Sequence, residues 1–165
     1  PFADRMQWIE AAATQLPAMQ VDLVTMTANV AQVFLTDDGW ALTLAGIRGA
    51  LRPGGFLVFE VRDPARRAWL GWTPDATREV ATIAGVGRVE TWTEVTAVDL
   101  PFVSFRHTFV FESDGAVVVS DSTLRFRSHH EIVETLEVAG FVVVDTHDAP
   151  DRPGLEFVFV ARRHD

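Results

Sequence analysis

Histidine, aspartate and glutamate are the side chains with which this chain can move protons. It contains no cysteine and no tyrosine, and it has no lysine either, because all 14 of its Lys and Arg positions are arginine. Lysine Schiff bases, cysteine nucleophiles and thiolate metal sites are therefore excluded. His107 is the leading candidate for a general base, since histidine as a residue type titrates near neutrality. Arg106 and Arg125 are the other polar side chains in this region best able to act on a substrate.

These three residues lie in runs where apolar and polar positions alternate, which is typical of β-strands. Alternation puts Arg106 and His107 on opposite faces of a sheet, so at most one of them faces a substrate pocket. Either residue can equally be solvated or paired across strands. The sequence leaves both interpretations open.

Other polar residues follow two apolar runs that suit buried strands. Asn29 and Gln32 come after residues 21–27, and Arg62 ends the run of residues 56–62. Ligands in open α/β sheets bind beyond the carboxyl ends of the strands, so these side chains are candidates for a binding site. Asn29 can instead satisfy only the turn backbone, and Arg62 can form either a solvated ion pair or a contact with a carboxylate or phosphate.

A short helix is predicted directly after the second run. Asp63 is a suitable cap and Pro64 fits the first helical position. Trp69 and Trp72 follow, three residues apart, and they either wall an apolar substrate pocket or pack into a core.

The elements that must position these residues begin with a βαβ unit. Residues 21–27 and 56–62 are its strands, and a helix lies between them, with Thr36, Asp37 and Asp38 supplying capping oxygens and negative charge for its first turn. Pro53 prevents the helix from continuing, and Gly54 and Gly55 permit the turn into the second strand. The apolar face of the helix is formed by Trp40, Leu44, Ile47 and Leu51.

A later helix is marked by a capping box from Ser128 to Glu131 and by Gly140 as a left-handed stop. His129 and His130 at its start invite a metal interpretation. Adjacent helical residues point in different directions and no third ligand is suitably spaced, so no metal site is predicted. Two closing strands, residues 141–146 and 156–161, follow this helix.

Several of these segments resemble one family. Asp22-Leu-Val-Thr-Met-Thr and Leu51-Arg-Pro-Gly-Gly-Phe-Leu-Val-Phe-Glu are similar to the fourth and fifth strands of class I S-adenosylmethionine-dependent methyltransferases. Leu136-Glu-Val-Ala-Gly-Phe-Val-Val-Val resembles the last helix and sixth strand, and Met6-Gln-Trp-Ile-Glu resembles the third strand. The resemblance implies an α/β fold with a partial Rossmann-like sheet, in residues 1–76 and 128–165. It also implies that the two closing strands form the antiparallel edge hairpin.

The resemblance implies S-adenosylmethionine as cofactor. In the family the loop after the fourth strand lines the methionine portion of the cofactor and faces the substrate. An acidic residue after the third strand contacts the adenine, but the matching positions here are alanines 11–13. Either Glu10 substitutes or apolar packing holds the adenine. The implied cofactor-binding residues are Glu10, Ala12, Thr27, Asn29, Val30 and Phe34. The implied substrate-binding residues are Gln32, Arg62, Trp69, Trp72, Arg106 and Arg125.

The Gly-rich first strand and loop of the family have no counterpart upstream of Val21, so we expect the chain to be part of a longer protein. In the family order 3-2-1-4-5-7-6 that strand lies against the one matched by residues 21–27. An unpaired edge there predicts a homo-oligomer, strand swapping or pairing with residues 6–10. The alternative is a monomer whose residues 1–20 cover the edge.

An antiparallel β insertion is predicted in residues 77–127, between the fifth strand and the last helix. Residues 88–98, 102–111 and 117–126 alternate, and Asp114-Gly115 forms the core of a hairpin turn. Three or four strands are expected. In several small-molecule methyltransferases an insertion at this place covers the active site. The resemblance therefore implies a substrate lid or part of a dimer interface.

Composition narrows the function classes. A chain of 165 residues with 48% hydrophobic residues can bury one substantial core. The net charge of −9 argues against nucleic acid as a partner. No apolar run is long enough to cross a membrane and no signal peptide precedes the first strand, so we expect a cytoplasmic protein without membrane contact.

The activity that the resemblance implies is transfer of a methyl group from S-adenosylmethionine to a small-molecule nucleophile by in-line displacement. This reaction depends mainly on positioning, and a base is optional for a free amine or an acidic hydroxyl. Fold analogy does not choose among N, O and C acceptors. One alternative is a non-catalytic methyltransferase-like module that acts as an assembly or ligand-binding partner. Another, a nicotinamide-dependent oxidoreductase, needs the same Gly-rich turn and matches poorly elsewhere.

Overall fold

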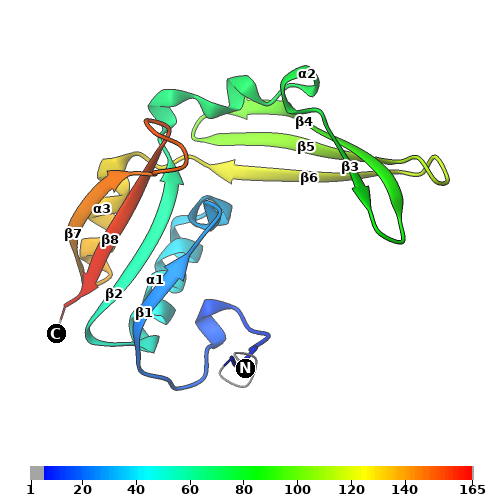
Figure 1. Ribbon diagram of the computed structural model, residues 1–165. Coiled ribbons are helices and arrows are strands. Elements are labelled where there is room, and N and C mark those ends of the chain that lie inside the picture. The colour runs from blue at the N-terminus through cyan, green and yellow to red at the C-terminus, as the bar shows by residue number, and fades with distance from the viewer. Residues whose placement is uncertain (1–5, 165) are drawn as a thin grey trace.

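The computed structural model describes residues 6–164, which form two four-stranded sheets (Figure 1). The first sheet has the strand order β1-β2-β8-β7 and the second has the order β3-β4-β5-β6. The first consists of β1 (Val21–Met26), β2 (Leu51–Arg62), β7 (Phe141–Asp148) and β8 (Glu156–Arg163). Its order matches the 4-5-7-6 part of the family sheet, so the predicted Rossmann-like core is confirmed.

Helix α1 (Asp37–Ala50) connects β1 to the parallel strand β2, as predicted. The Thr36 hydroxyl accepts a hydrogen bond from the backbone N–H of Gly39 at 3.1 Å, which satisfies one free donor of the first turn. Trp40, Leu44 and Ile47 recur on one face of the helix and are at most 2% exposed. The burial of this stripe holds the helix on the sheet.

Strand β2 begins at Leu51, five residues earlier than predicted. Leu51 pairs with Val21, and the register then shifts so that Leu23 pairs with Phe56. The predicted turn therefore lies inside the strand as an irregularity, with Gly54 at φ +75°. A Cβ atom on Gly55 would lie 3.1 Å from the carbonyl oxygen of Asp22, so glycine lets the two strands approach here.

Strand β1 lies at one edge of the first sheet and pairs only with β2 among the described residues. The predicted strand at residues 6–10 is wrong, because residues 6–12 have no regular structure and the side chain of Trp8 is 89% exposed. Pairing of that segment with β1 is therefore also absent from the part of the chain that the structure describes. The expected burial of β1 on both faces is wrong too, since Leu23 is 52% exposed at an edge that no other strand of residues 6–164 covers.

Helix α3 (His129–Val138) carries the predicted capping box and ends before Gly140, which has φ +82°. It packs beside α1 on one face of the first sheet, where Leu57, Phe59 and Val61 of β2 alternate inward. The indole nitrogen of Trp40 donates to the Thr135 hydroxyl at 2.9 Å and links the two helices. Strands β7 and β8 form the predicted antiparallel hairpin. Within residues 6–164 no helix combines the length and apolar character needed to cross a lipid bilayer.

The second sheet confirms the predicted antiparallel insertion of three or four strands, and it has four. It consists of β3 (Glu79–Ile83), β4 (Gly87–Asp99), β5 (Phe102–Phe111) and β6 (Val117–Arg125). In Figure 1 it extends to the right of the first sheet as a long arm, in green to yellow. The chain enters it through η4 (Pro64–Arg66), η5 (Ala68–Gly71) and α2 (Pro74–Thr77).

Candidate active site

The site forms where the parallel strands β1 and β2 end at the same edge of the sheet (Figure 1). The chain leaves β1 through Ala28 and Asn29, both at φ 58°, and enters the turn η3 (Val30–Val33). The backbone N–H of Ala28 donates to the carboxylate of Glu60 in β2 at 2.8 Å. This contact fixes the start of the loop against the neighbouring strand.

Asn29 and Gln32 are each only 1% exposed. The side-chain nitrogen of Asn29 donates to Glu156 Oε1 at 3.0 Å, and Arg62 donates to Gln32 Oε1 at 3.0 Å. A carboxylate only accepts and a guanidinium only donates, so these partners fix the orientation of both amides. Asn29 Oδ1 and Gln32 Nε2 are left as a buried acceptor and a buried donor without partners among the described residues. Such atoms are rare in folded proteins and mark places where a ligand or water is expected.

Glu156 is the centre of this cluster. It pairs opposite Arg62 in the β2–β8 ladder, and its Oε1 lies 3.8 Å from Arg62 Nε and 2.7 Å from Arg152 Nη1. Burial lowers the pKa of Arg62, and the charge of Glu156 opposes this change. The hydrogen bond from Arg152 to Glu156 raises the pKa of Arg152. One buried carboxylate is thus shared by two guanidinium groups.

A cavity of about 550 Å³ adjoins the cluster. Arg62 contributes to both, and its guanidinium lies 5.5 Å from the ring centroid of Trp72. The charged and apolar groups around the cavity include Arg62, Arg66, Arg67, Arg152, Trp72 and Leu155. A hollow of this size can hold a small organic molecule.

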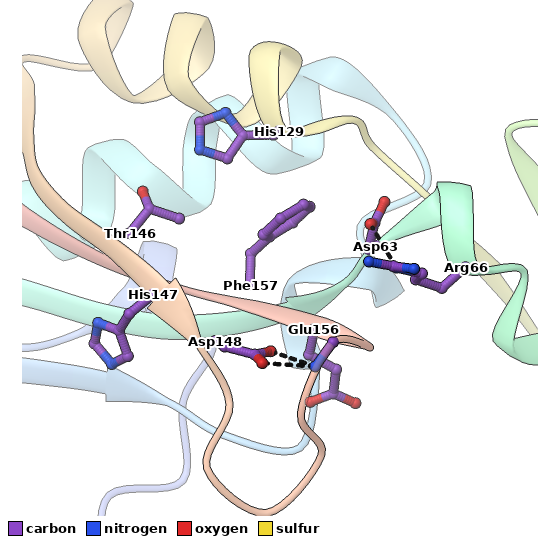
Figure 2. Close-up of a pocket in the computed structure, with 9 residues that line it drawn as sticks. Asp63, Arg66, His129, Thr146, His147, Asp148, Glu156 and Phe157 are labelled. Carbon is purple, nitrogen blue, oxygen red and sulfur yellow. Dashed lines mark hydrogen bonds and ion pairs between the residues drawn. The ribbon is translucent and has the colours of Figure 1, made fainter.

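A second cavity, of about 440 Å³, shares Arg66 and Glu156 with the first (Figure 2). In Figure 2 the imidazole of His129 projects from α3 toward Phe157, and the two rings are 5.3 Å apart. The carboxylate of Asp148 accepts from the backbone N–H of Gly154 at 2.6 and 2.7 Å and so shapes the β7–β8 loop. Among residues 6–164 no three potential ligands converge as a metal site.

Several solved methyltransferases share this architecture. No protein-family model matches the sequence, and no curated protein is similar enough in sequence to match. An S-adenosylmethionine-dependent methyltransferase from Clostridium acetobutylicum superposes with a TM-score of 0.72 at 12% identity, over 99% of this chain and 68% of that protein. CalS10, an amino pentose methyltransferase from Micromonospora echinaspora, gives 0.65 at 16% identity, over 93% of this chain and 63% of that one. The chain has the class I methyltransferase fold.

A third neighbour, the glycopeptide N-methyltransferase MtfA solved with S-adenosylhomocysteine, gives a TM-score of 0.59 at 16% identity. The superposition covers 98% of this chain and 62% of MtfA. The chain thus spans about two thirds of the length of the methyltransferases that it matches.

In this methyltransferase fold, three of the predicted site residues come together. Asn29, Gln32 and Arg62 form one hydrogen-bonded cluster with Glu156. Asn29 does more than satisfy its own turn backbone, because its side chain also donates to Glu156. Arg62 is 22% exposed as a side chain, so its ion pair is largely removed from solvent.

The other residues predicted around the β1 loop fall into two groups. Thr27, Val30 and Phe34 belong to the loop itself, and the Phe34 ring lies 5.7 Å from that of Trp40. Glu10 and Ala12 are exposed and belong to a segment without regular structure. The neighbouring Ala13 packs against Gly46 in the second half of α1, away from the end of that helix that joins the β1 loop.

Trp69 and Trp72 have different environments. Trp72 lines the first cavity, whereas Trp69 is 5% exposed and its ring lies 4.7 Å from Phe126 in the small core of the second sheet. Asp63 accepts a hydrogen bond from the backbone N–H of Ala65 at 2.9 Å, which confirms its predicted capping role, although the turn that it caps is a 3₁₀-helix.

The predicted residues of the second sheet lie outside both cavities. Arg106 forms two hydrogen bonds of 2.8 Å with Asp121 on the neighbouring strand. Arg125 bonds to the carbonyl of Leu35 at 3.1 Å and pairs with Asp37. The His107 ring stacks on Phe109 at 4.4 Å, and its Nε2 is buried without a partner among the described residues.

Sequence reasoning missed Glu156, Arg152 and Arg67. Glu156 is a charged residue at the first position of a strand whose next five residues, 157–161, are apolar, and it lies four residues after Arg152. That spacing was the available signal, but nothing local indicated that the carboxylate would be buried against a loop 127 positions away.

Proposed function

We propose that this chain carries part of a methyltransferase site that transfers a methyl group from S-adenosylmethionine to a small-molecule acceptor. One observation supports this most directly. A buried acceptor and a buried donor, Asn29 Oδ1 and Gln32 Nε2, lie without partners at the carboxyl edge of a methyltransferase-type sheet. In open α/β sheets this edge is where ligands bind.

The residues of the β1 loop fit the amino-acid end of that cofactor. Asn29 Oδ1 can accept from an ammonium group, and Gln32 Nε2 can donate to a carboxylate. When bound, the cofactor supplies an electrophilic methyl group. Thr27, Val30 and Phe34 are the other loop residues that we assign to it. Glu10 and Ala12 stay predicted adenine contacts, and this role requires that their segment adopt a different position from the one in this structure.

The chain's own contribution to the reaction is positioning. Gln32 in the β1 loop accepts a hydrogen bond from Arg62, which lines the first cavity, so this pair can orient an acceptor toward the methyl group. Trp72 would form a wall for the acceptor. The described residues of the cluster include no histidine, which suits an acceptor that needs no strong base, and a role for His107, Arg106 or Arg125 stays a prediction.

The test is calorimetric titration of S-adenosylhomocysteine into this chain and into a version extended at its amino end. We expect saturable binding, and we expect Gln32→Met to weaken it about tenfold, because one buried hydrogen bond to a charged group is lost. Gln15→Met, in the exposed turn η2 (Ala13–Gln15), is the matched control and should bind normally. Absence of binding in both chain lengths would refute the proposal and favour a non-catalytic assembly or ligand-binding module.

Self-association is a separate proposal. Strand β1 has an edge that is unpaired among the described residues, and Val117, Val118 and Val119 of the edge strand β6 are at least 50% exposed. We propose that one of these two edges forms a homo-oligomer. Light scattering of the wild type and of Val118→Lys measures the oligomeric state and distinguishes the two edges. The introduced charge should dissociate an oligomer formed through β6 and leave one formed through β1 intact.

A further inference from the structure

The cavity next to Arg62 has an unusual charge for this molecule. Four arginines and one glutamate line it, in a chain that has 23 acidic and 14 basic residues overall. The acidic lining residue, Glu156, already accepts hydrogen bonds from Asn29 and Arg152. The positive charges of the arginines that line the cavity therefore outnumber the negative charge of its one lining carboxylate.

The pairing of the individual arginines sharpens this point. Arg152 lies 2.7 Å from a carboxylate oxygen of Glu156, whereas Arg62, whose side chain is 22% exposed, lies 3.8 Å from the same oxygen. Arg66 is 3.6 Å from Asp63. Arg67 forms no ion pair within residues 6–164, and its backbone is left-handed at φ 49°. A non-glycine residue in this conformation is uncommon and is found more often at functional sites.

The remaining walls are apolar. The Trp72 ring lies beneath Arg62, and Leu70 and Leu155 are 68% and 45% exposed beside it. A ligand that fits these groups has an anionic end for the guanidinium groups and an apolar or planar body for the indole and the leucines. Guanidinium groups bind carboxylate and phosphate in the same bidentate manner.

We propose that this cavity is the subsite for an anionic group, a carboxylate or a phosphate, of the methyl acceptor. The assignment to an acceptor rests on the proposed function, but the binding of an anion does not. Arg67 supplies a charge that has no ion pair among the described residues, and Arg62 supplies a guanidinium that shares the Glu156 carboxylate with Arg152. Arg66 and Arg152 add donors at the rim, and Trp72 contacts the apolar body. The cavity volume of about 550 Å³ suits a molecule of this kind.

The test uses the whole 165-residue chain and three probes of similar shape: phenyl phosphate, benzoate and the neutral benzamide. Binding is followed by calorimetry at low salt and by the NMR signals of the arginine Nε–H groups. We expect at least one anion to bind about tenfold more tightly than benzamide and to shift the signals of Arg62 and Arg67. The anion that binds more tightly shows whether the subsite prefers a phosphate or a carboxylate group.

Two variants complete the test. Arg67→Gln removes an exposed charge that has no ion pair among the described residues, and it should weaken the better anion about tenfold. Arg88→Gln removes a 56% exposed arginine side chain in the second sheet and should change nothing. Equal binding of benzamide and benzoate with no tighter phosphate, or unchanged affinity in Arg67→Gln, would overturn the proposal.

The result is independent of cofactor binding. If the anions bind while S-adenosylhomocysteine does not, the anion subsite stands and the methyltransferase assignment falls. If S-adenosylhomocysteine binds and the anions do not, only the anion subsite is refuted.

Discussion

Asn29 and Glu156 are 127 positions apart in the sequence, yet the side-chain amide of Asn29 donates to the Glu156 carboxylate at 3.0 Å in the interior. Both residues are at most 4% exposed. The bond joins the loop after β1 to the start of β8, with β2 between them in the sheet. The candidate site therefore depends on strands β1, β2 and β8 being assembled in one sheet.

Loss of the Glu156 carboxylate should destabilise the fold strongly. Glu156→Ala leaves the partly buried Arg62 and the Asn29 amide uncompensated, and we expect a loss of about 3–5 kcal/mol in the free energy of unfolding. Glu156→Gln keeps an acceptor for Asn29 and should lose less. Urea denaturation measures both. Glu137→Gln on the exposed side of α3 is the control and should change stability by less than about 0.5 kcal/mol. A Glu156→Ala protein as stable as this control would contradict the arrangement.

The elements around the site were predictable because their signals are local. Thr36 and Ser128 cap their helices as the sequence indicates, and the stripe of α1 is buried on the predicted face. Asn29 and Gln32 could be chosen as site residues by a general rule, since they follow a strand that ends at a ligand-binding edge.

The cluster around Glu156 could not be predicted in the same way, because the pairing of β2 with β8 brings its members together. The third strand failed for a related reason. Residues 6–10 have an apolar pattern, but an isolated strand needs a partner for its backbone groups, and none is formed within the described residues. Local sequence does not contain that information.

Two glycines of α1 should respond in opposite directions to alanine. A Cβ atom at Gly46 would lie 2.2 Å from the carbonyl oxygen of Ala13, whereas at Gly49 nothing lies within 4 Å. Gly49→Ala should stabilise the protein by up to about 1 kcal/mol through helix propensity. Gly46→Ala should lose that gain and displace residues 13–15. Thermal unfolding of the two variants is the measurement, and equal stabilisation by both would show that η2 does not pack against α1.

Arg127 ties the end of the second sheet to the start of α1. Its Nη2 donates to the carbonyls of Phe34 at 2.8 Å and of Thr36 at 3.3 Å, and burial lowers its pKa to about 10. Arg127→Met leaves these carbonyls without their donor, and we expect a loss of about 1–3 kcal/mol in the free energy of unfolding. Arg127→Gln retains a donor without the buried charge and should lose less. Equal losses in the two variants would argue against a hydrogen-bonding role.

The capping box of α3 should make stability depend on pH. Burial acts to raise the pKa of Glu131, but the hydrogen bonds with Ser128 and the charges of Arg125 and Arg127 outweigh it, so the pKa lies below its ordinary value of 4.5. The ionised carboxylate therefore stabilises the folded chain fully above pH 4.5. This contribution is lost as the pH falls through the lowered pKa, because the unfolded chain binds the proton first.

Glu131→Gln tests this directly, since glutamine can complete a capping box and does not titrate. The free energy of unfolding of the wild type should exceed that of the variant by a constant amount at neutral pH, and the difference should shrink below pH 4.5. Urea denaturation at several pH values from 3 to 7 measures it, with Glu137→Gln as a control for an exposed carboxylate on the same helix. Only a group whose pKa differs between the folded and unfolded states makes the free energy of unfolding depend on pH. If the wild type and Glu131→Gln differed by the same amount at every pH, the Glu131 carboxylate would gain nothing from its contact with Ser128.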